Sequence, residues 1–222
     1  MRGLHAARAM MLAGAIGLSC GLAWAGQLMG SSVPGRDIEQ SASLVSFGTA
    51  RLPSGLADFC ARQPEKCQPV KEQAQTLQLT HARWELLSTV NGEVNQRVAS
   101  TTDEKLYGRL EYWTLPATAG DCEDYVLLKR QMLAERGIPL SSLLITVVQD
   151  ENGEGHAVLT VPTTLGDLVL DNRRDQILNW RETGYKFVKR QSPQSVTAWV
   201  ALGREKLQAT VIASGPEASP AQ

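Results

Sequence analysis

The order of the periodic segments is the feature that most constrains the fold of this chain. Two stretches with helical periodicity come first, at residues 80–98 and 120–136. Three short stretches rich in Val, Ile, Leu and Thr follow, at residues 143–149, 156–161 and 167–170. Turn residues separate them, as between the strands of hairpins. Helices followed by consecutive strands predict an α+β fold with a largely antiparallel sheet, not alternating βαβ units.

Both helical stretches carry terminal signals. Apolar residues recur every three or four positions in the first, with Thr80 as a candidate N-cap. The second begins at Asp121 with acids in its first turn, and Gly137 with a following proline marks its end. We expect Lys129 and Arg130 on the solvated face of this second helix.

The N-terminus predicts export. Two arginines precede an apolar run over residues 10–25, which closes with an Ala-Trp-Ala cleavage site. We therefore predict a cleaved signal peptide at residues 1–25. A membrane anchor is the alternative, although the run is short for a stable span. Residues 26–55 are expected to be a loosely ordered N-terminal segment, residues 56–212 the folded domain, and residues 213–222 a disordered tail.

Charge gives no sign of a nucleic-acid partner. The formal net charge is −1, and acidic and basic residues are evenly mixed along the chain. Neither a basic nucleic-acid surface nor a polybasic membrane patch is expected.

The cysteines point to one reactive thiol. Cys20 leaves with the predicted signal peptide. Cys60 and Cys67 bracket a short loop and can pair in an oxidising compartment. Cys122 is then left alone, and an unpaired cysteine in an exported protein is a candidate reactive thiol. The alternative is a buried structural cysteine.

Cys122 can form a nucleophilic site with two later residues. It lies at the N-terminus of the second helix, where amide groups and the helix dipole favour a thiolate. His156 begins a predicted strand and can take the thiol proton. Asp171 ends the next strand and can orient the imidazole. Asp167, at the other end of that strand, is a rival for the role of the acid.

Three acids surround the nucleophile in sequence: Asp121, Glu123 and Asp124. An ideal helix places them on one broad side, with Cys122 pointing away. Three clustered oxygen ligands suit a hard cation such as calcium. Complementarity to the helix dipole explains the same acids equally well.

Five sequence blocks resemble one known family, the bacterial transglutaminase-like cysteine proteinases of the periplasmic LapG type. The resemblance covers roughly residues 77–197, and its blocks are NGEVNQ, DEKLYGRLEYW, GDCEDYVLLKR, GHAVLTV and LVLDN. It implies a papain-like or transglutaminase-like core with the nucleophile at a helix N-terminus. Carried over, the triad is Cys122 as nucleophile, His156 as general base and acid, and Asp171 as orienting acid.

The resemblance also implies a cofactor, a substrate and a partner. Family members depend on calcium, and the implied ligands here are Asp121, Glu123 and Asp124. Members cut large surface adhesins near the N-terminus, at a pair of alanines, and so release biofilm. An inner-membrane receptor that senses cyclic di-GMP sequesters the protease in the periplasm. We expect a periplasmic monomer with an adhesin substrate and such a receptor as partner.

Two other functions remain compatible with the sequence. The same triad would serve a transglutaminase or amidase that passes the acyl group to an amine. A non-catalytic binding module could also keep this shell, although the intact Cys, His and Asp count against it. For a peptidase, the Cys122 backbone N–H is a natural oxyanion donor. Trp113 is a weak candidate for the second donor, because buried indoles also simply pack.

Overall fold

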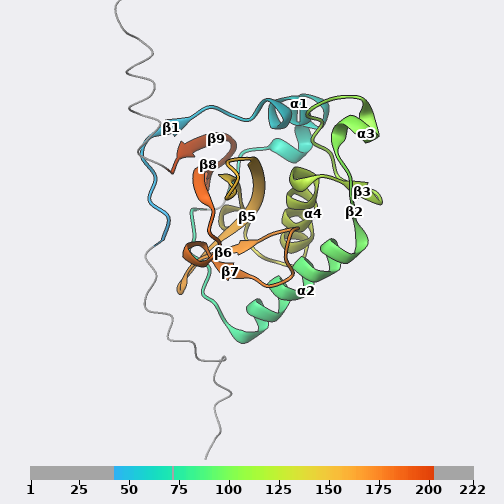
Figure 1. Cartoon of the computed structure of the whole chain (residues 1–222). Coiled ribbons are helices and arrows are strands. Elements are labelled where there is room, and N and C mark those ends of the chain that lie inside the picture. The colour runs from blue at the N-terminus through green and yellow to red at the C-terminus, as the bar shows by residue number, and fades with distance from the viewer. Residues whose placement is uncertain (1–42, 72, 203–222) are drawn as a thin grey trace, which may run out of the picture. The chain divides into compact units, whose positions relative to one another are not determined.

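The computed structural model describes residues 43–71 and 73–202, and the predicted signal peptide and tail lie outside them. Figure 1 shows helices on one side of a sheet. The α-helices in this part are α1 (Ser54–Arg62), α2 (His81–Arg97), α3 (Asp103–Tyr107) and α4 (Cys122–Glu135). Short 3-10 helices are η1 (Pro64–Cys67), η2 (Leu140–Ser142) and η3 (Trp180–Glu182). The strands are β1 (Thr49–Ala50), β2 (Ala99–Ser100), β3 (Ala119–Gly120), β4 (Leu144–Gln149), β5 (Gly155–Thr163), β6 (Gly166–Leu170), β7 (Leu178–Asn179), β8 (Lys186–Ser192) and β9 (Ser195–Ala201).

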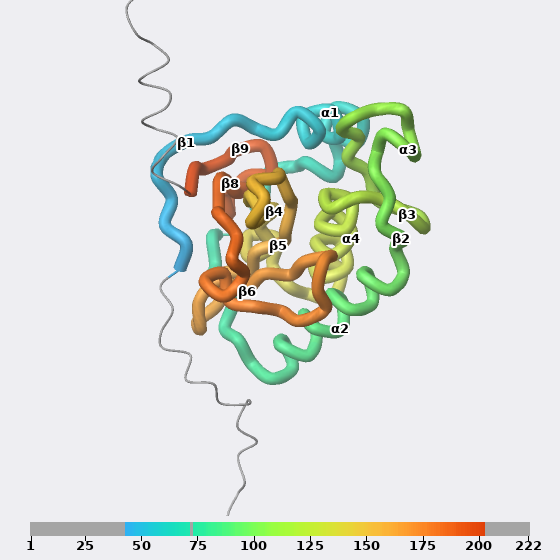
Figure 2. Tube along the Cα trace, in the orientation of Figure 1, coloured from blue at the N-terminus to red at the C-terminus, as the bar shows by residue number. Residues whose placement is uncertain are grey.

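The main sheet of the described residues has seven strands in the order β1-β9-β8-β4-β5-β6-β7. Every neighbouring pair in it is antiparallel. The small β2–β3 pair, beside the start of α4, is parallel. The α+β prediction with a largely antiparallel sheet is therefore confirmed, and Figure 2 follows the chain through it.

Both faces of this sheet are covered. On one face α4 packs on β5 and α2 packs on α4, in a core that includes Leu87, Val90, Leu133 and Leu159. On the other face a second cluster joins Val148, Val158, Val169, Tyr185 and Phe187 with Leu44 and Leu202. Nearly all of β5 is buried as a result. Strands buried on both faces show continuous apolar runs instead of strict alternation.

The two predicted long helices and their caps are confirmed. Thr80 Oγ1 accepts a hydrogen bond from the Arg83 backbone N–H at 3.3 Å and caps α2. After α4 the chain turns at Gly137, whose φ of +88° belongs to the left-handed region that favours glycine. The Ile138 N–H donates to the Leu133 carbonyl across this turn at 3.0 Å. Such a turn satisfies carbonyls that the end of the helix leaves unpaired.

Other expectations need correction. Lys129 and Arg130 are not on a solvated face, because α4 lies between α2 and β5 and both side chains are buried. The polar stretch at residues 99–105 is predicted to be a loop by its composition, but it contains β2 and the start of α3. The segment expected to be loosely ordered up to residue 55 includes β1 and the first turn of α1.

A disulfide between Cys60 and Cys67 joins α1 to η1. This resolves the pairing that the sequence left open, and Cys122 is the free cysteine of the described residues. Arg62 at the end of α1 donates from Nη2 to the Trp113 carbonyl at 2.7 Å and stacks over the Tyr112 ring. The disulfide therefore supports the helix that holds the chain segment leading towards α4.

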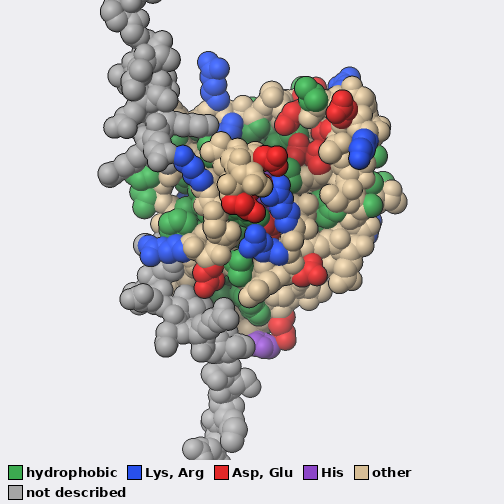
Figure 3. Space-filling view, viewed as in Figure 1, with side chains coloured by type: hydrophobic (Ala, Val, Ile, Leu, Met, Phe, Trp, Pro, Cys, Tyr) green, Lys and Arg blue, Asp and Glu red, His purple; other side chains and the backbone are tan. Residues whose placement is uncertain are grey.

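The surface has mixed charge. Acidic and basic side chains are interspersed over the face drawn in Figure 3. Large exposed apolar side chains gather mainly in and just after α3, where Leu110 is 84% exposed. In the part of the chain that the structure covers, no helix is both long enough and apolar enough to cross a bilayer.

Candidate active site

The sheet brings His156 and Asp171 together. In the register of β5 with β6, Leu159 lies opposite Leu170. Continuing this register places Asp171 opposite Val158, on the sheet face that also carries His156. The two side chains meet with His156 Nε2 2.8 Å from Asp171 Oδ1, and each is only 1% exposed.

Several donors hold the Asp171 carboxylate as an ion. Tyr185 Oη donates to Oδ2 at 2.6 Å, the Arg173 backbone N–H donates to Oδ1 at 3.0 Å, and Arg174 Nε lies 3.5 Å from Oδ2. Burial alone would raise the pKa of Asp171, but the hydrogen bonds from His156, Arg173 and Tyr185 outweigh it and lower the pKa to about 2. An ionised carboxylate only accepts, so His156 Nε2 donates the hydrogen bond to Asp171, and Nδ1 is the ring nitrogen that this bond does not use.

The Cys122 sulfur lies beside the peptide unit of His156. It accepts a hydrogen bond from the backbone N–H of Ala157, the next residue along β5. Cys122 is the first residue of α4, and α4 packs on β5. The fold thus brings the thiol to the strand that carries the imidazole.

The Cys122 thiol donates a hydrogen bond to an acidic side chain. Cys122 Sγ donates to Glu123 Oε2 at 3.0 Å, so the expectation that Cys122 points away from all three acids is wrong for Glu123. Burial, together with the charge and hydrogen bond of Glu123, raises the pKa of Cys122 well above its ordinary value, although the Ala157 N–H acts in the other direction. Burial also raises the pKa of Glu123, to about 8. In this arrangement the sulfur is a protonated thiol.

Two candidates from the sequence have other partners here. Asp167 Oδ2 accepts from Arg190 Nη1 at 2.7 Å and from the Leu44 backbone N–H at 3.2 Å. It therefore anchors the chain near Leu44 and is not the acid beside the imidazole. The Trp113 indole N–H donates to Glu111 Oε2 at 3.0 Å, so the candidate second oxyanion donor is already engaged.

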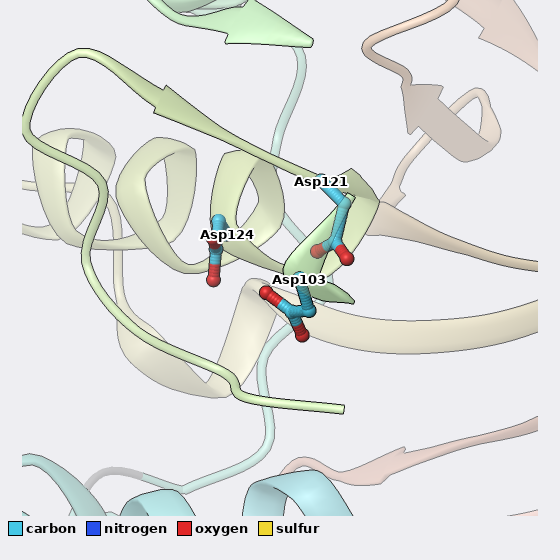
Figure 4. A group of neighbouring side chains, drawn as sticks. All are labelled: Asp103, Asp121 and Asp124. Atoms are coloured by element: carbon cyan, nitrogen blue, oxygen red, sulfur yellow. The ribbon is translucent and has the colours of Figure 1, made fainter. Parts of the chain in front are cut away.

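A cluster of three aspartates lies next to the nucleophile. Asp103 begins α3, Asp121 directly precedes α4, and Asp124 is in the first turn of α4. One carboxylate oxygen from each lies within 4.8 Å of the others, and Figure 4 shows the three side chains converging. Asp103 was not foreseen, because it lies 18 residues before Asp121 in a stretch that reads as a loop. The side chain of Glu123 is directed to the sulfur and is not part of this cluster.

The cluster fits a hard cation. Asp103 Oδ1, Asp121 Oδ1 and Asp124 Oδ2 are buried and have no hydrogen-bond partner in the described residues. The other oxygens of Asp103 and Asp124 accept from the backbone N–H groups of Tyr112 and Thr114. Burial, with the charges of Asp121 and Asp103, raises the pKa of Asp124 to about 7. Unpaired anionic oxygens at this spacing are the ligands that calcium prefers.

Comparison with known proteins identifies the family of the chain. The sequence model of the bacterial transglutaminase-like cysteine proteinases matches residues 46–207. No protein with a curated function matches the chain significantly. Among solved structures, LapG of Legionella pneumophila is 27% identical; its EGTA-treated and calcium-bound structures each have a TM-score of 0.47 and cover 55% of this chain and 69% and 71% of their own. A third structure of that protein, with a TM-score of 0.46, covers 59% of this chain and 75% of its own. The family model spans well over half of the sequence, and the chain therefore belongs to the bacterial transglutaminase-like cysteine proteinases and is a cysteine peptidase.

Proposed function

We propose that the chain is a calcium-dependent cysteine endopeptidase with Cys122, His156 and Asp171 as its catalytic residues. The observation that carries this assignment is the buried His156–Asp171 pair, 2.8 Å apart, beside the Ala157 N–H that binds the Cys122 sulfur. A nucleophile, a base and a group that orients the base are the three components of this kind of catalysis.

The geometry sets the direction of proton transfer. Asp171 occupies His156 Nε2, so the thiol proton passes to Nδ1, and the sulfur must first exchange its Glu123 acceptor for that nitrogen. The thiolate then attacks the scissile carbonyl carbon, the C–N bond breaks, and His156 returns the proton to the leaving amine. Water hydrolyses the thioester and regenerates the thiol.

The oxyanion formed on attack needs hydrogen-bond donors. The backbone N–H of Cys122 is in the first turn of α4, where amide groups have no acceptor within the helix. It is therefore the donor that we propose for the carbonyl oxygen of the substrate as that oxygen gains charge.

We propose calcium as the resident cation of the aspartate cluster. Asp103, Asp121 and Asp124 would hold it, and the buried unpaired oxygens support this choice. When bound, the ion supplies the positive charge that lets three close carboxylates ionise together. Because Asp121 precedes the nucleophile directly, fixing its side chain also fixes the entry of the chain into α4.

We further propose that the substrate is a large surface adhesin, cut at an Ala-Ala pair near its N-terminus. Release of the adhesin would disperse biofilm, and an inner-membrane receptor for cyclic di-GMP would sequester the peptidase. The proposal rests on the sequence resemblance within the family and on the predicted signal peptide. The disulfide between Cys60 and Cys67 suits an oxidising compartment such as the periplasm.

The test uses the mature protein and the periplasmic portion of a large adhesin encoded in the same genome. Wild type is incubated with it in calcium and in excess chelator, next to Cys122→Ala and Asp171→Asn. We expect cleavage by wild type in calcium alone, with the new N-terminus at an Ala-Ala pair. Ser141→Ala, a substitution in η2, is the matched control and should cleave normally.

Two results would redirect the assignment. Cleavage that persists in Cys122→Ala would remove the nucleophile from the proposal. Incorporation of an amine probe without new termini would identify an acyl transferase on the same residues instead of an endopeptidase.

A further inference from the structure

Asp171, the acid of the proposed triad, lies in a turn that accepts hydrogen bonds from side chains of α2. After β6 the chain turns through residues 171–175. Two asparagines of α2, Asn91 and Asn95, are one helical turn apart and face this turn. They are the first and fifth residues of the NGEVNQ block, whose role the peptidase chemistry does not explain.

Both amides donate to the turn. Asn95 Nδ2 lies 3.0 Å from the Asp171 carbonyl, 3.2 Å from the Arg174 carbonyl and 2.9 Å from Asp175 Oδ1. Asn91 Nδ2 lies 3.2 Å from the Arg174 carbonyl and 2.9 Å from the Asp175 carbonyl. The backbone of the turn is therefore bound at three of its five residues.

The adjoining side of α2 packs on α4, the helix that begins at Cys122. Val90 and Val94 belong to the core that α2 shares with Val126 and Leu133 of α4. One rigid helix thus contacts both the element that starts at Cys122 and the turn that starts at Asp171. A displacement of the turn relative to α4 would have to break the amide hydrogen bonds.

Burial of these two amides has a cost in stability. Asn91 is fully buried, and its Oδ1 has no partner in the described residues, nor has the Oδ1 of Asn95. Lys129 Nζ, on the α4 side, is also buried without a partner there. Burying polar atoms without partners costs stability, and an apolar residue would avoid that cost. The benefit must come from the hydrogen bonds that the amides make to the turn.

We propose that Asn91 and Asn95 are positioning residues, an amide clamp that keeps the Asp171 carboxylate in line with His156 Nε2. This inference rests on the proposed triad. Without the clamp the turn can shift, the imidazolium loses its carboxylate partner, and the thiolate–imidazolium pair forms less readily. The clamp does not touch the substrate, so it acts on kcat and not on KM.

The experiment measures alkylation of Cys122 by iodoacetamide between pH 5.5 and 8.5, and kcat and KM on a peptide with an Ala-Ala bond, in calcium. The variants are Asn95→Ala and Asn91→Ala in the mature protein. The matched control is Thr80→Ala, which removes the N-cap of the same helix far from the turn. His156→Ala reports on the triad itself.

We expect Asn95→Ala to lower kcat and the alkylation rate near pH 6.5 by about 10- to 100-fold, as small misplacements of catalytic groups do. KM should stay within about twofold, because substrate contacts are intact. Thr80→Ala should lower the melting temperature and leave alkylation unchanged. Wild-type alkylation and kcat in Asn95→Ala, or an equal loss in Thr80→Ala, would overturn the clamp.

Two further outcomes are separable. If His156→Ala alkylates as fast as wild type, the proposed triad fails, and the clamp fails with it. If Asn95→Ala does not fold, Asn95→Asp keeps the size of the side chain while placing a carboxylate against the carbonyls of Asp171 and Arg174. If neither variant folds although Thr80→Ala does, the amide serves folding and the positioning role is rejected.

Discussion

Tyr185 completes the hydrogen bonding of the carboxylate that faces the imidazole. Its hydroxyl donates to Asp171 Oδ2, and its ring lies edge-on to the His156 ring, with centroids 5.6 Å apart. Burial and the neighbouring Asp171 charge raise the pKa of Tyr185, so the hydroxyl stays a neutral donor. Tyr185 therefore contributes packing and a charge-assisted hydrogen bond at once.

Tyr185→Phe separates these contributions. The ring remains and the hydroxyl is lost, so we expect the free energy of unfolding at pH 7 to fall by about 1.5–3 kcal/mol, the usual value for hydrogen bonds to charged groups. The pKa of Asp171 is depressed in the folded protein, to about 2, so the stability it contributes is present above pH 4 and is lost as pH falls towards 2. Denaturant titrations at pH 7 and pH 2.5 should show a larger difference at pH 7 than at pH 2.5. Tyr107→Phe at the exposed α3 is the control, and an equal loss there would contradict the expectation.

Lys129 is a buried amine on the nucleophile's helix. Burial lowers its pKa to about 7, although Asp171 and Asp175 act in the opposite direction. The unfolded side chain keeps a pKa near 10.4, so between about pH 7 and 10 the unfolded state binds the extra proton and wild-type stability rises with pH. The amine thus destabilises the fold most at and below neutral pH.

Lys129→Met should therefore stabilise the protein, by about 1–4 kcal/mol at pH 6, because similar replacements of buried charges do so. The gain over wild type should shrink as pH approaches 10. Thermal denaturation at pH 6 and pH 9.5 measures it, and Lys105→Met on the exposed side of α3 is the control. A variant less stable than wild type at pH 6 would contradict this expectation. It would show that the interactions of the Lys129 amine stabilise the fold by more than the burial of the amine destabilises it.

At this scale the sequence predicted some site residues and not others. Cys122, His156 and Asp171 were nominated because a helix start and two strand ends are readable from local pattern. Their catalytic roles stay a proposal. Asp103 and the contact of Glu123 with the thiol depend on how the chain folds back between α3 and α4. Lys129 looked solvated because its burial comes from α2, a helix that only tertiary structure brings over it.

Among the elements, α1 is the helix whose stability depends most on the Cys60–Cys67 disulfide. It is a nine-residue helix, joined to η1 by the Cys60–Cys67 disulfide, and isolated helices of this length are marginal. Gly55 in its first turn leaves room for Trp113, since a Cβ there would lie 2.3 Å from the indole. Helix α1 therefore braces the segment that provides the Tyr112 and Thr114 amides to the aspartate cluster.

Removing the disulfide should destabilise α1 and the segment around Tyr112 and Thr114 that it contacts. For Cys60→Ser/Cys67→Ser we expect a loss of about 2–3 kcal/mol in the free energy of unfolding, from closure of a short loop. Calcium affinity should also fall, because the two amides that orient Asp103 and Asp124 become mobile. Denaturant titration and calcium calorimetry measure the two effects, with Cys122→Ser as the single-thiol control. Unchanged calcium affinity would show that the cluster is independent of α1.

The elements that the sequence predicted are those with strong local signals. The helices α2 and α4 have caps and long periodic stretches, and β4 and β5 flank a turn rich in Gly and Asn. The short α1 and α3 and the strand β9 were missed. Five- to nine-residue helices carry little periodicity, and β9 alternates Thr and Ser with apolar residues only along half of its length.

In the whole molecule, the site is assembled where the helices meet the sheet. The thiol and the aspartates come from the helical side, through α4 and the chain that leads into it. The imidazole and its carboxylate come from β5 and β6. Anything that moves α4 along β5, including the charge state of the aspartates at its start, therefore changes the distance between the Cys122 sulfur and the His156 imidazole.

Calcium binding should consequently depend on pH, and protein stability should follow it. Without the ion, burial raises the pKa of Asp121 and holds the pKa of Asp124 near 7, so the folded protein binds protons that the unfolded chain has lost. This favours the apo fold at acidic pH, and the contribution is lost as pH rises through 7.

Calcium requires the ionised carboxylates, so its binding releases a proton below pH 7. We expect the calcium Kd to weaken about fivefold from pH 7 to pH 6, which is the change in the ionised fraction of a carboxyl group of pKa about 7, and chelator to lower Tm more at pH 8 than at pH 6. Calorimetry in two buffers of different ionisation enthalpy counts the proton, and Asp124→Asn should lose both the proton release and most of the affinity. A Kd independent of pH in wild type would show that the cation is held by groups outside this cluster.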